Sequence, residues 1–170
     1  MNSDEQGIAP ILVLGVGNVL LGDDGVGPRL VKELQGLYAN EESVECIDGG
    51  TQGLALIGYL GGRQSLVVLD ALADGRNAGE VSVLDYAALC EYRVTHSATA
   101  HESNAGELLA TAQLLGDLPE RVFLVGVAPE RIQTELGLSE SVSKSLPAAF
   151  ARACETIEQE LEHFQSSAAA

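Results

Sequence analysis

The sequence predicts a single α/β domain, with a five-stranded, mostly parallel twisted sheet and helices on both faces. Short apolar runs rich in Val, Ile and Leu alternate with segments of helical periodicity, which is the pattern of parallel α/β folds. The chain has 170 residues, of which 46% are hydrophobic, and its 19 glycines are spread along it. We expect one domain over residues 1–170, with an ordered core from about residue 10 to residue 164.

The first half of the chain predicts three strands. ILVLG at 11–15 is typical of a buried parallel strand that ends in glycine. The segment 24–38 predicts a helix, because its apolar residues recur at helical spacing. A second strand at 44–48, the turn GGTQG and a short helix at 54–60 follow. The run SLVVLDAL predicts a third strand, which ends at Asp70.

The second half predicts two further strands and two helices. EVSVLD at 80–85 alternates apolar and polar residues, so we expect a strand at the edge of the sheet, which could pair antiparallel with its neighbour. The stretch after it is irregular, and a helix follows at 105–115. VFLVGVAP is the fifth strand. The last helix is expected over 139–164, although Pro147 should start or kink a segment, and SSAAA should be a frayed tail.

The charge balance argues against nucleic acid as a partner. Lys and Arg number 9 against 25 Asp and Glu, so the formal net charge is 9 − 25 = −16. Phosphate contacts need clustered Lys and Arg, which this chain lacks. An acidic excess of this kind is usually a solvated surface, and the alternative is that it steers cations or basic segments.

The cysteines and the N-terminus predict a cytoplasmic protein with no membrane partner. Cys46, Cys90 and Cys154 form no CxxC and no paired pattern, so we expect reduced, mostly buried thiols. MNSDEQGIAP is polar and acidic, unlike a secretory signal. No apolar run approaches the roughly 20 residues of a membrane-spanning helix.

Asp23 and Asp24 follow the first strand within the loop GVGNVLLGDDGVG. One interpretation is helix capping, since Asp is favoured where backbone N–H groups are unpaired. Phosphate binding is a weaker one, because Leu20 stands where the third glycine of GxGxxG belongs and two acids would repel phosphate.

Two other aspartates end predicted strands. Asp70 follows the hydrophobic run SLVVL, where an ionised carboxylate needs a partner, and Asp48 precedes GGTQG. Either could be a cap or turn residue. However, the carboxyl ends of the strands are also where ligands gather in such sheets.

His96 and His101 lie in VTHSATAHESNAG, between the fourth strand and the next helix. A lone loop histidine is usually solvated, yet one imidazole with two carboxylates is a plausible site for a divalent first-row metal. Such an open site polarises a carbonyl and activates water. There is no GxSxG or HExxH, and the cysteines are interpreted as core residues.

These motifs together resemble those of hydrogenase-maturation endopeptidases. GVGNVLLGDDGVG, DGGTQG, VVLDAL, HSATAHESNAG and LVGVAPE occur in the family's order, and the likeness covers about residues 11 to 160. The resemblance implies a five-stranded sheet between helices. It also implies an endopeptidase that removes the C-terminal extension of a nickel-loaded hydrogenase large-subunit precursor, just after the cysteine motif that ligates the metal.

The resemblance also assigns the site. The nickel contacts of relatives match Asp24, where many relatives have Glu, together with Asp70 and His101. Relatives have a tighter histidine and glycine spacing than this chain, and His96 is the rival third ligand. Asp48, Gly49, Gly50 and Thr51 match the turn thought to help select the substrate.

The resemblance implies that nickel comes with the precursor and is not bound permanently. Either the metal or one carboxylate would activate the water. The expected partner is the precursor, and the protein itself is expected to be a monomer. The alternatives are a non-enzymatic metal-binding or nucleotide-binding α/β protein, and a hydrolase of small substrates or an unrelated peptidase.

Overall fold

The computed structural model describes residues 7–95 and 104–169 and contains one five-stranded sheet. Its strand order is β2-β1-β3-β5-β4. The bounds are β1 Ile11–Val16, β2 Val44–Gly50, β3 Ser65–Ala71, β4 Val81–Asp85 and β5 Arg121–Val127. The first three and β5 pair in parallel, and β4 pairs antiparallel with β5 at one edge. The predicted fold class is therefore confirmed, including the antiparallel edge strand.

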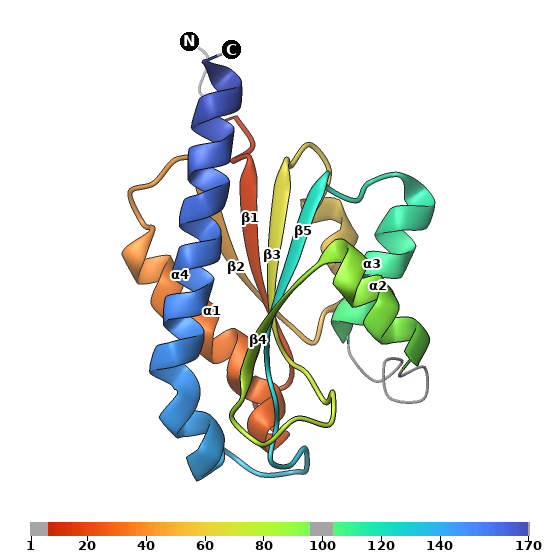
Figure 1. The fold of residues 1–170 in the computed structure, drawn as a ribbon, viewed down its shortest axis with the longest axis vertical. Coiled ribbons are helices and arrows are strands. Elements are labelled where there is room, and N and C mark those ends of the chain that lie inside the picture. The colour runs from red at the N-terminus through yellow and green to blue at the C-terminus, as the bar shows by residue number, and fades with distance from the viewer. Residues whose placement is uncertain (1–6, 96–103, 170) are drawn as a thin grey trace.

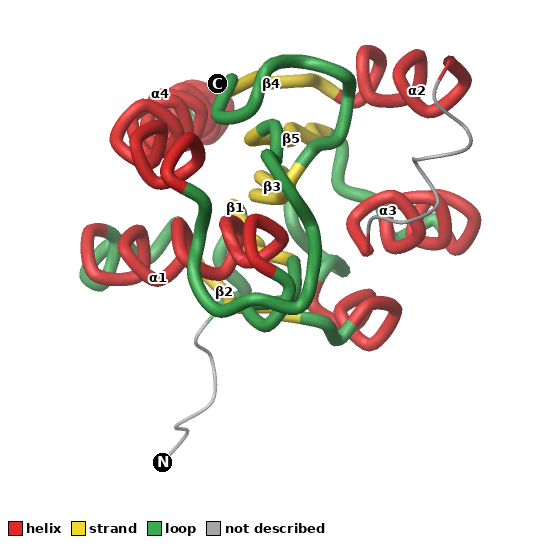
Figure 2. The backbone as a smooth tube through the Cα atoms, turned by 90° about the horizontal axis from the view of Figure 1, so that it is seen from below, coloured by secondary structure: helices red, strands yellow, loops and turns green. Residues whose placement is uncertain are grey.

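Helices cover both faces of this sheet (Figure 1). The 3-10 helices are η1 Gly22–Gly25 and η2 Gly53–Tyr59, and the α-helices are α1 Val26–Leu37, α2 Tyr86–Thr95, α3 Asn104–Leu115 and α4 Glu140–Ala168. Seen from below, α1 and α4 lie on one side of the sheet and α2 and α3 on the other (Figure 2). Each side has its own hydrophobic cluster, and the central strands β1 and β3 are buried on both faces.

Two predictions about helices were wrong. The irregular stretch after β4 contains α2, whose sequence has weak amphipathic character although Leu89 is buried. The last helix continues through Pro147 to Ala168, so residues 166–168 of the expected frayed tail are helical. The missing N–H of Pro147 costs one helical bond, and burial of Val142, Ala149 and Ala153 on either side of it keeps the helix in place.

An ion pair between buried Glu160 and partly exposed Arg121 joins α4 to the start of β5. The Glu160 carboxylate accepts hydrogen bonds from Arg121 Nε and Nη2, each at 2.7 Å, and from the Ser65 hydroxyl at 2.5 Å. Ser65 and Arg121 are the first residues of β3 and β5. No helix within the described ranges combines the length and apolarity needed to cross a bilayer.

Candidate functional site

The candidate site lies at the carboxyl ends of β1, β2 and β3, where the structure places the predicted aspartates Asp24, Asp48 and Asp70. The loop after β1 folds back tightly because Gly17 has a φ of +130°, and a Cβ at this position would lie 1.9 Å from the Asp24 carbonyl oxygen. A side chain at residue 17 would therefore push η1 away. Gly17 thus allows η1 to lie against the end of the sheet.

Asp24 is half-buried and its side chain closes this loop. Its Oδ2 accepts a hydrogen bond from the Asn18 backbone N–H at 2.6 Å. The N-cap of α1 is Gly25, and no side chain caps that helix. The capping interpretation of Asp24 is therefore not what the structure has, because its carboxylate bonds the preceding loop instead of the N–H groups of α1.

Asp70 lies at the end of β3, next to last in the strand, and is only 4% exposed. Its Oδ1 accepts a hydrogen bond from the Ala71 backbone N–H at 2.8 Å. Burial, with a smaller contribution from the negative charge of Asp24, raises the pKa of Asp70 well above its usual value, although the Ala71 bond opposes the shift. A buried carboxylate in this condition is one that a cation would stabilise.

The two carboxylates are neighbours, since η1 packs against β3 and the charge of Asp24 acts on Asp70. Among the described residues, none of the ion pairs includes Asp24 or Asp70. Two acids at the start of a helix also disfavour phosphate, which argues against nucleotide binding here. The arrangement can instead supply two oxygen ligands to a divalent metal.

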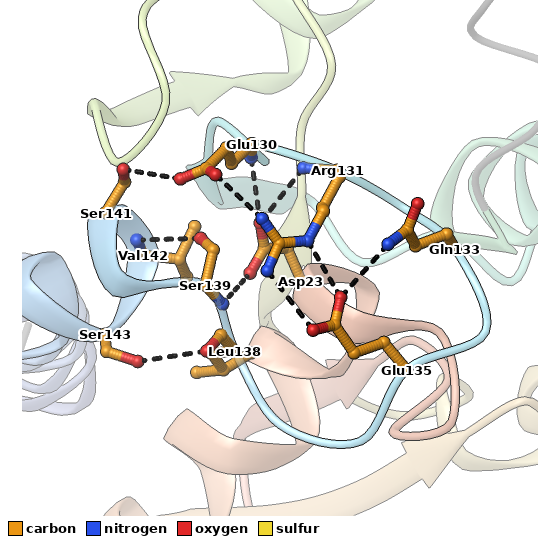
Figure 3. A network of polar contacts seen from close by, with 10 residues as sticks. All are labelled: Asp23, Glu130, Arg131, Gln133, Glu135, Leu138, Ser139, Ser141, Val142 and Ser143. Carbon is orange, nitrogen blue, oxygen red and sulfur yellow. Dashed lines mark hydrogen bonds and ion pairs between the residues drawn. The ribbon is translucent and has the colours of Figure 1, made fainter.

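Asp23 has a different role from its neighbour Asp24. It is 1% exposed and accepts three backbone hydrogen bonds: Oδ2 from Glu130 and Arg131 at 2.8 and 3.2 Å, and Oδ1 from Ser139 at 2.6 Å (Figure 3). Burial alone would raise the pKa of Asp23, but the three N–H donors outweigh it and the pKa lies below its usual value. Asp23 is thus an ionised structural clamp.

The clamp holds the 128–139 segment around η1, as the view from below shows (Figure 2). The Gly22 N–H donates to the Glu135 carbonyl at 2.9 Å, and the Glu135 N–H donates to the Leu20 carbonyl at 3.1 Å. Neither this segment nor Asp23 had a separate predicted role. Two consecutive aspartates show no difference in sequence, because their burial depends on a segment more than 100 residues away.

The predicted substrate-recognition turn lies at the outer end of β2. Asp48, Gly49 and Gly50 are the last residues of the strand, two residues more than expected, and Thr51 is exposed beyond it. Asp48 Oδ1 accepts a hydrogen bond from the Gly50 N–H at 3.1 Å, and the Gly50 carbonyl accepts one from Gly17 at 3.0 Å. The turn is therefore bonded to the loop that carries Asp24.

The histidine predictions lie outside the described residues, since both His96 and His101 fall in 96–103. Within residues 7–95 and 104–169, no group of three or more His, Cys, Asp or Glu side chains could hold a metal. Cys46, Cys90 and Cys154 are free thiols as expected, but each is half-buried instead of buried.

Comparison with known proteins gives a consistent result. A family model described as hydrogenase maturation protease matches residues 28–156. The hydrogenase 2 maturation protease of Escherichia coli K12 is 33% identical over 139 residues, which cover 82% of this chain and 85% of that protein. The hydrogenase expression/formation protein HupD of Bradyrhizobium diazoefficiens is 32% identical, covering 86% and 77%.

Solved structures agree with these matches. The hydrogenase maturating endopeptidase HybD from E. coli superposes with a TM-score of 0.76 at 32% identity, covering 88% of this chain and 93% of that one. The hydrogenase 2 maturation peptidase from the Thaumarchaeota archaeon SCGC_AB-539-E09 gives a TM-score of 0.66 at 32% identity, covering 87% and 97%. The sequence and fold comparisons therefore point to the same group of proteins.

Proposed function

The chain belongs to the hydrogenase maturation protease family, and from this premise we propose that it removes the C-terminal extension of a nickel-loaded hydrogenase large-subunit precursor. It is an endopeptidase, a hydrolase of peptide bonds. Its partner in this proposal is the precursor, and nickel enters the site as part of that substrate. We propose that it acts in the cytoplasm as a monomer.

The observation that supports nickel recognition most strongly is the pairing of Asp70 with Asp24. Asp70 is 4% exposed, carries a raised pKa and has a second carboxylate beside it, yet no cation pairs with either acid among the described residues. Two like charges in a poorly solvated place destabilise each other, and a divalent metal between them would reverse the sign of that interaction.

In this mechanism Asp24, Asp70 and His101 would ligate the nickel of the precursor and thereby position the scissile peptide beside them. Nickel binding is then a specificity test, because a precursor without metal would lack the central contact. Water attacks the scissile carbonyl, activated either by the metal or by one of the carboxylates once it has released the metal. His101 must be neutral to bind, so coordination depends on pH.

The Asp48 to Thr51 turn would contact the substrate next to this site. It is bonded to the Asp24 loop through Gly17 and Gly50, and Asp48 and Thr51 are exposed. A rigid turn beside the scissile peptide would help to discriminate between precursors.

The test is cleavage of purified large-subunit precursor, with and without nickel, by the wild type and by Asp24→Asn, Asp70→Asn and His101→Ala. Asp117→Asn is the matched control, because Asp117 is an exposed acid just beyond the end of α3. We expect the wild type to cleave only the nickel-loaded precursor, and we expect its rate to fall by on the order of 100-fold or more in the three variants. Loss of a hydrogen-bond partner of a metal ligand already lowers metal affinity or activity by about 10- to 100-fold. Asp24→Glu should retain activity because it keeps the carboxylate.

Each variant separates one part of the proposal. Undiminished trimming by His101→Ala together with loss in His96→Ala would move the third ligand to His96. Trimming that is equally fast without nickel would refute nickel recognition. No trimming of any precursor, together with tight nickel binding by the protein alone, would refute the protease role and favour a metal-binding protein.

A further inference from the structure

A groove opens beside Gly25, the residue that follows Asp24. It has a volume of about 320 Å³ and lies between the start of α1, the end of β2 and the 128–139 segment. Val19, Pro28 and Leu138 line it with apolar surface, and Arg29, Lys32 and Asp48 are its charged residues. Asp48, which belongs to the predicted substrate-recognition turn, also lines the groove, so the groove adjoins that turn.

The charge of this groove differs from that of the chain as a whole. Two of the 9 basic residues of a chain with net charge −16 lie in it, one turn apart on α1. Arg29 pairs with Glu33 at 3.2 Å. Lys32 is exposed, and the interactions of the described residues give its ammonium no partner. The one acid of the groove, Asp48, is engaged by the Gly50 N–H.

We propose that this groove binds the tail of the precursor just beyond the scissile bond, and that Lys32, with Arg29, selects tails with acidic residues. The inference rests on the proposed function, in which the part upstream of the cut belongs to the nickel-bearing body of the precursor. A groove of about 320 Å³ can hold a few residues of the other part, the tail, as an extended chain. The exposed apolar side chain of Val19 would contact the same segment.

The distance from Asp24 to Lys32 determines which residue of the bound tail lies near the Lys32 ammonium. Lys32 lies six residues beyond Val26, the first residue of α1, which corresponds to about 9 Å along the helix. Asp24 lies two residues before Val26, in η1, which adds about 3 to 4 Å. An extended peptide advances about 3.3 Å per residue, so its third or fourth residue beyond Asp24 would reach the ammonium. The volume is at the lower end of the range for ligand sites, which fits a few extended residues and no folded partner.

The test is a charge exchange between enzyme and substrate. Nickel-loaded precursors carry Glu, Ala or Lys at the second to fifth residues after the cut, and each is cleaved by the wild type, by Lys32→Glu and by Arg152→Glu. Arg152 is an exposed cation on α4, so its substitution changes the net charge equally and serves as the control. We expect the wild type to cleave the Glu tail about fivefold more efficiently than the Lys tail, chiefly through KM and less so at high salt.

Lys32→Glu should reverse this order, and Arg152→Glu should keep it. Equal cleavage of the three tails by the wild type, or the same reversal in Arg152→Glu, would overturn the groove assignment while leaving the proposed function intact. A wild-type dimer that Lys32→Glu dissociates in sedimentation would assign the groove to a second copy of the chain and overturn the inference. No cleavage of any tail by the wild type would refute the proposed function itself.

Discussion

The two ends of β3 hold buried carboxylates in opposite conditions. At the start, Glu160 reaches Ser65 and is 1% exposed, with two hydrogen bonds from Arg121 and one from the Ser65 hydroxyl. At the other end, Asp70 is 4% exposed, with one backbone hydrogen bond and a like charge beside it. Burial acts against ionisation at both places, yet the pKa of Glu160 is lowered and that of Asp70 is raised.

The difference separates structural from functional acids. A buried charge that has its full set of donors stabilises the fold, whereas one left without them costs stability and is kept where a ligand supplies the missing partner. Asp23 belongs with Glu160 in this respect, since it accepts three backbone hydrogen bonds although it adjoins Asp24. Functional and structural carboxylates are therefore neighbours in sequence but distinct in partners.

The largest expected effect comes from removing the charge of the Asp23 clamp. Asp23→Asn replaces one acceptor oxygen with an amide NH2 group that faces a backbone N–H donor, so the free energy of unfolding should fall by about 3 kcal/mol at pH 7. Urea denaturation measures this loss. Asp24→Asn is the matched variant, because an amide oxygen still accepts the Asn18 N–H, and it should cost less than about 1 kcal/mol.

The pH dependence sharpens the Asp23 prediction. The folded-state pKa of Asp23 is lowered, so the stabilisation is present above its ordinary value of 3.8 and is lost as pH falls through the folded pKa. The difference between the wild type and Asp23→Asn should therefore shrink below about pH 4. An equal cost for Asp23→Asn and Asp24→Asn would contradict the distinction between the two acids.

Most of the fold followed from local pattern. The strands β1, β3 and β5 have apolar central runs because helices cover both faces of the sheet, and β4, whose sequence alternates apolar and polar residues, lies at an edge as expected. The pattern failed where tertiary contacts decide. Helix α2 buries Leu89 without a clear apolar stripe, and α4 continues to Ala168, into the tail that was expected to be frayed.

The candidate site could be predicted in part. Asp24, Asp70 and Asp48 lie at the carboxyl edge as expected, since strand ends carry polar residues to one place. The roles of Asp23 and of the 128–139 segment could not be predicted, because they depend on hydrogen bonds across more than 100 residues. The third nickel ligand stays a prediction, since His96 and His101 lie outside the described residues.

A smaller effect is expected at the start of β3. Glu160→Gln should lower the free energy of unfolding by about 2 kcal/mol, less than is usual for a broken buried pair, because the side chain of Arg121 is 38% exposed and can be hydrated. Glu162→Gln, an exposed neighbour on α4, is the control. The catalytic rate of the folded variant should be unchanged, and a loss of cleavage without a loss of stability would contradict the structural role.

The smallest effect has the opposite sign. Asp70→Asn removes a buried charge but keeps an oxygen for the Ala71 N–H, so it should raise the free energy of unfolding by about 1 kcal/mol at pH 7 while abolishing cleavage. The folded-state pKa of Asp70 is raised, so its ionisation costs the wild type nothing below the ordinary value of 3.8 and an increasing amount as pH rises toward the folded pKa. The stability advantage of Asp70→Asn should follow that course in thermal unfolding measured from pH 3 to pH 8.

Because the charge of Asp24 contributes to the raised pKa of Asp70, the stability advantage of Asp70→Asn should be smaller in an Asp24→Asn background. A variant less stable than the wild type at neutral pH would mean that Asp70 already has the partners it needs, and the distinction between the two ends of β3 would not hold.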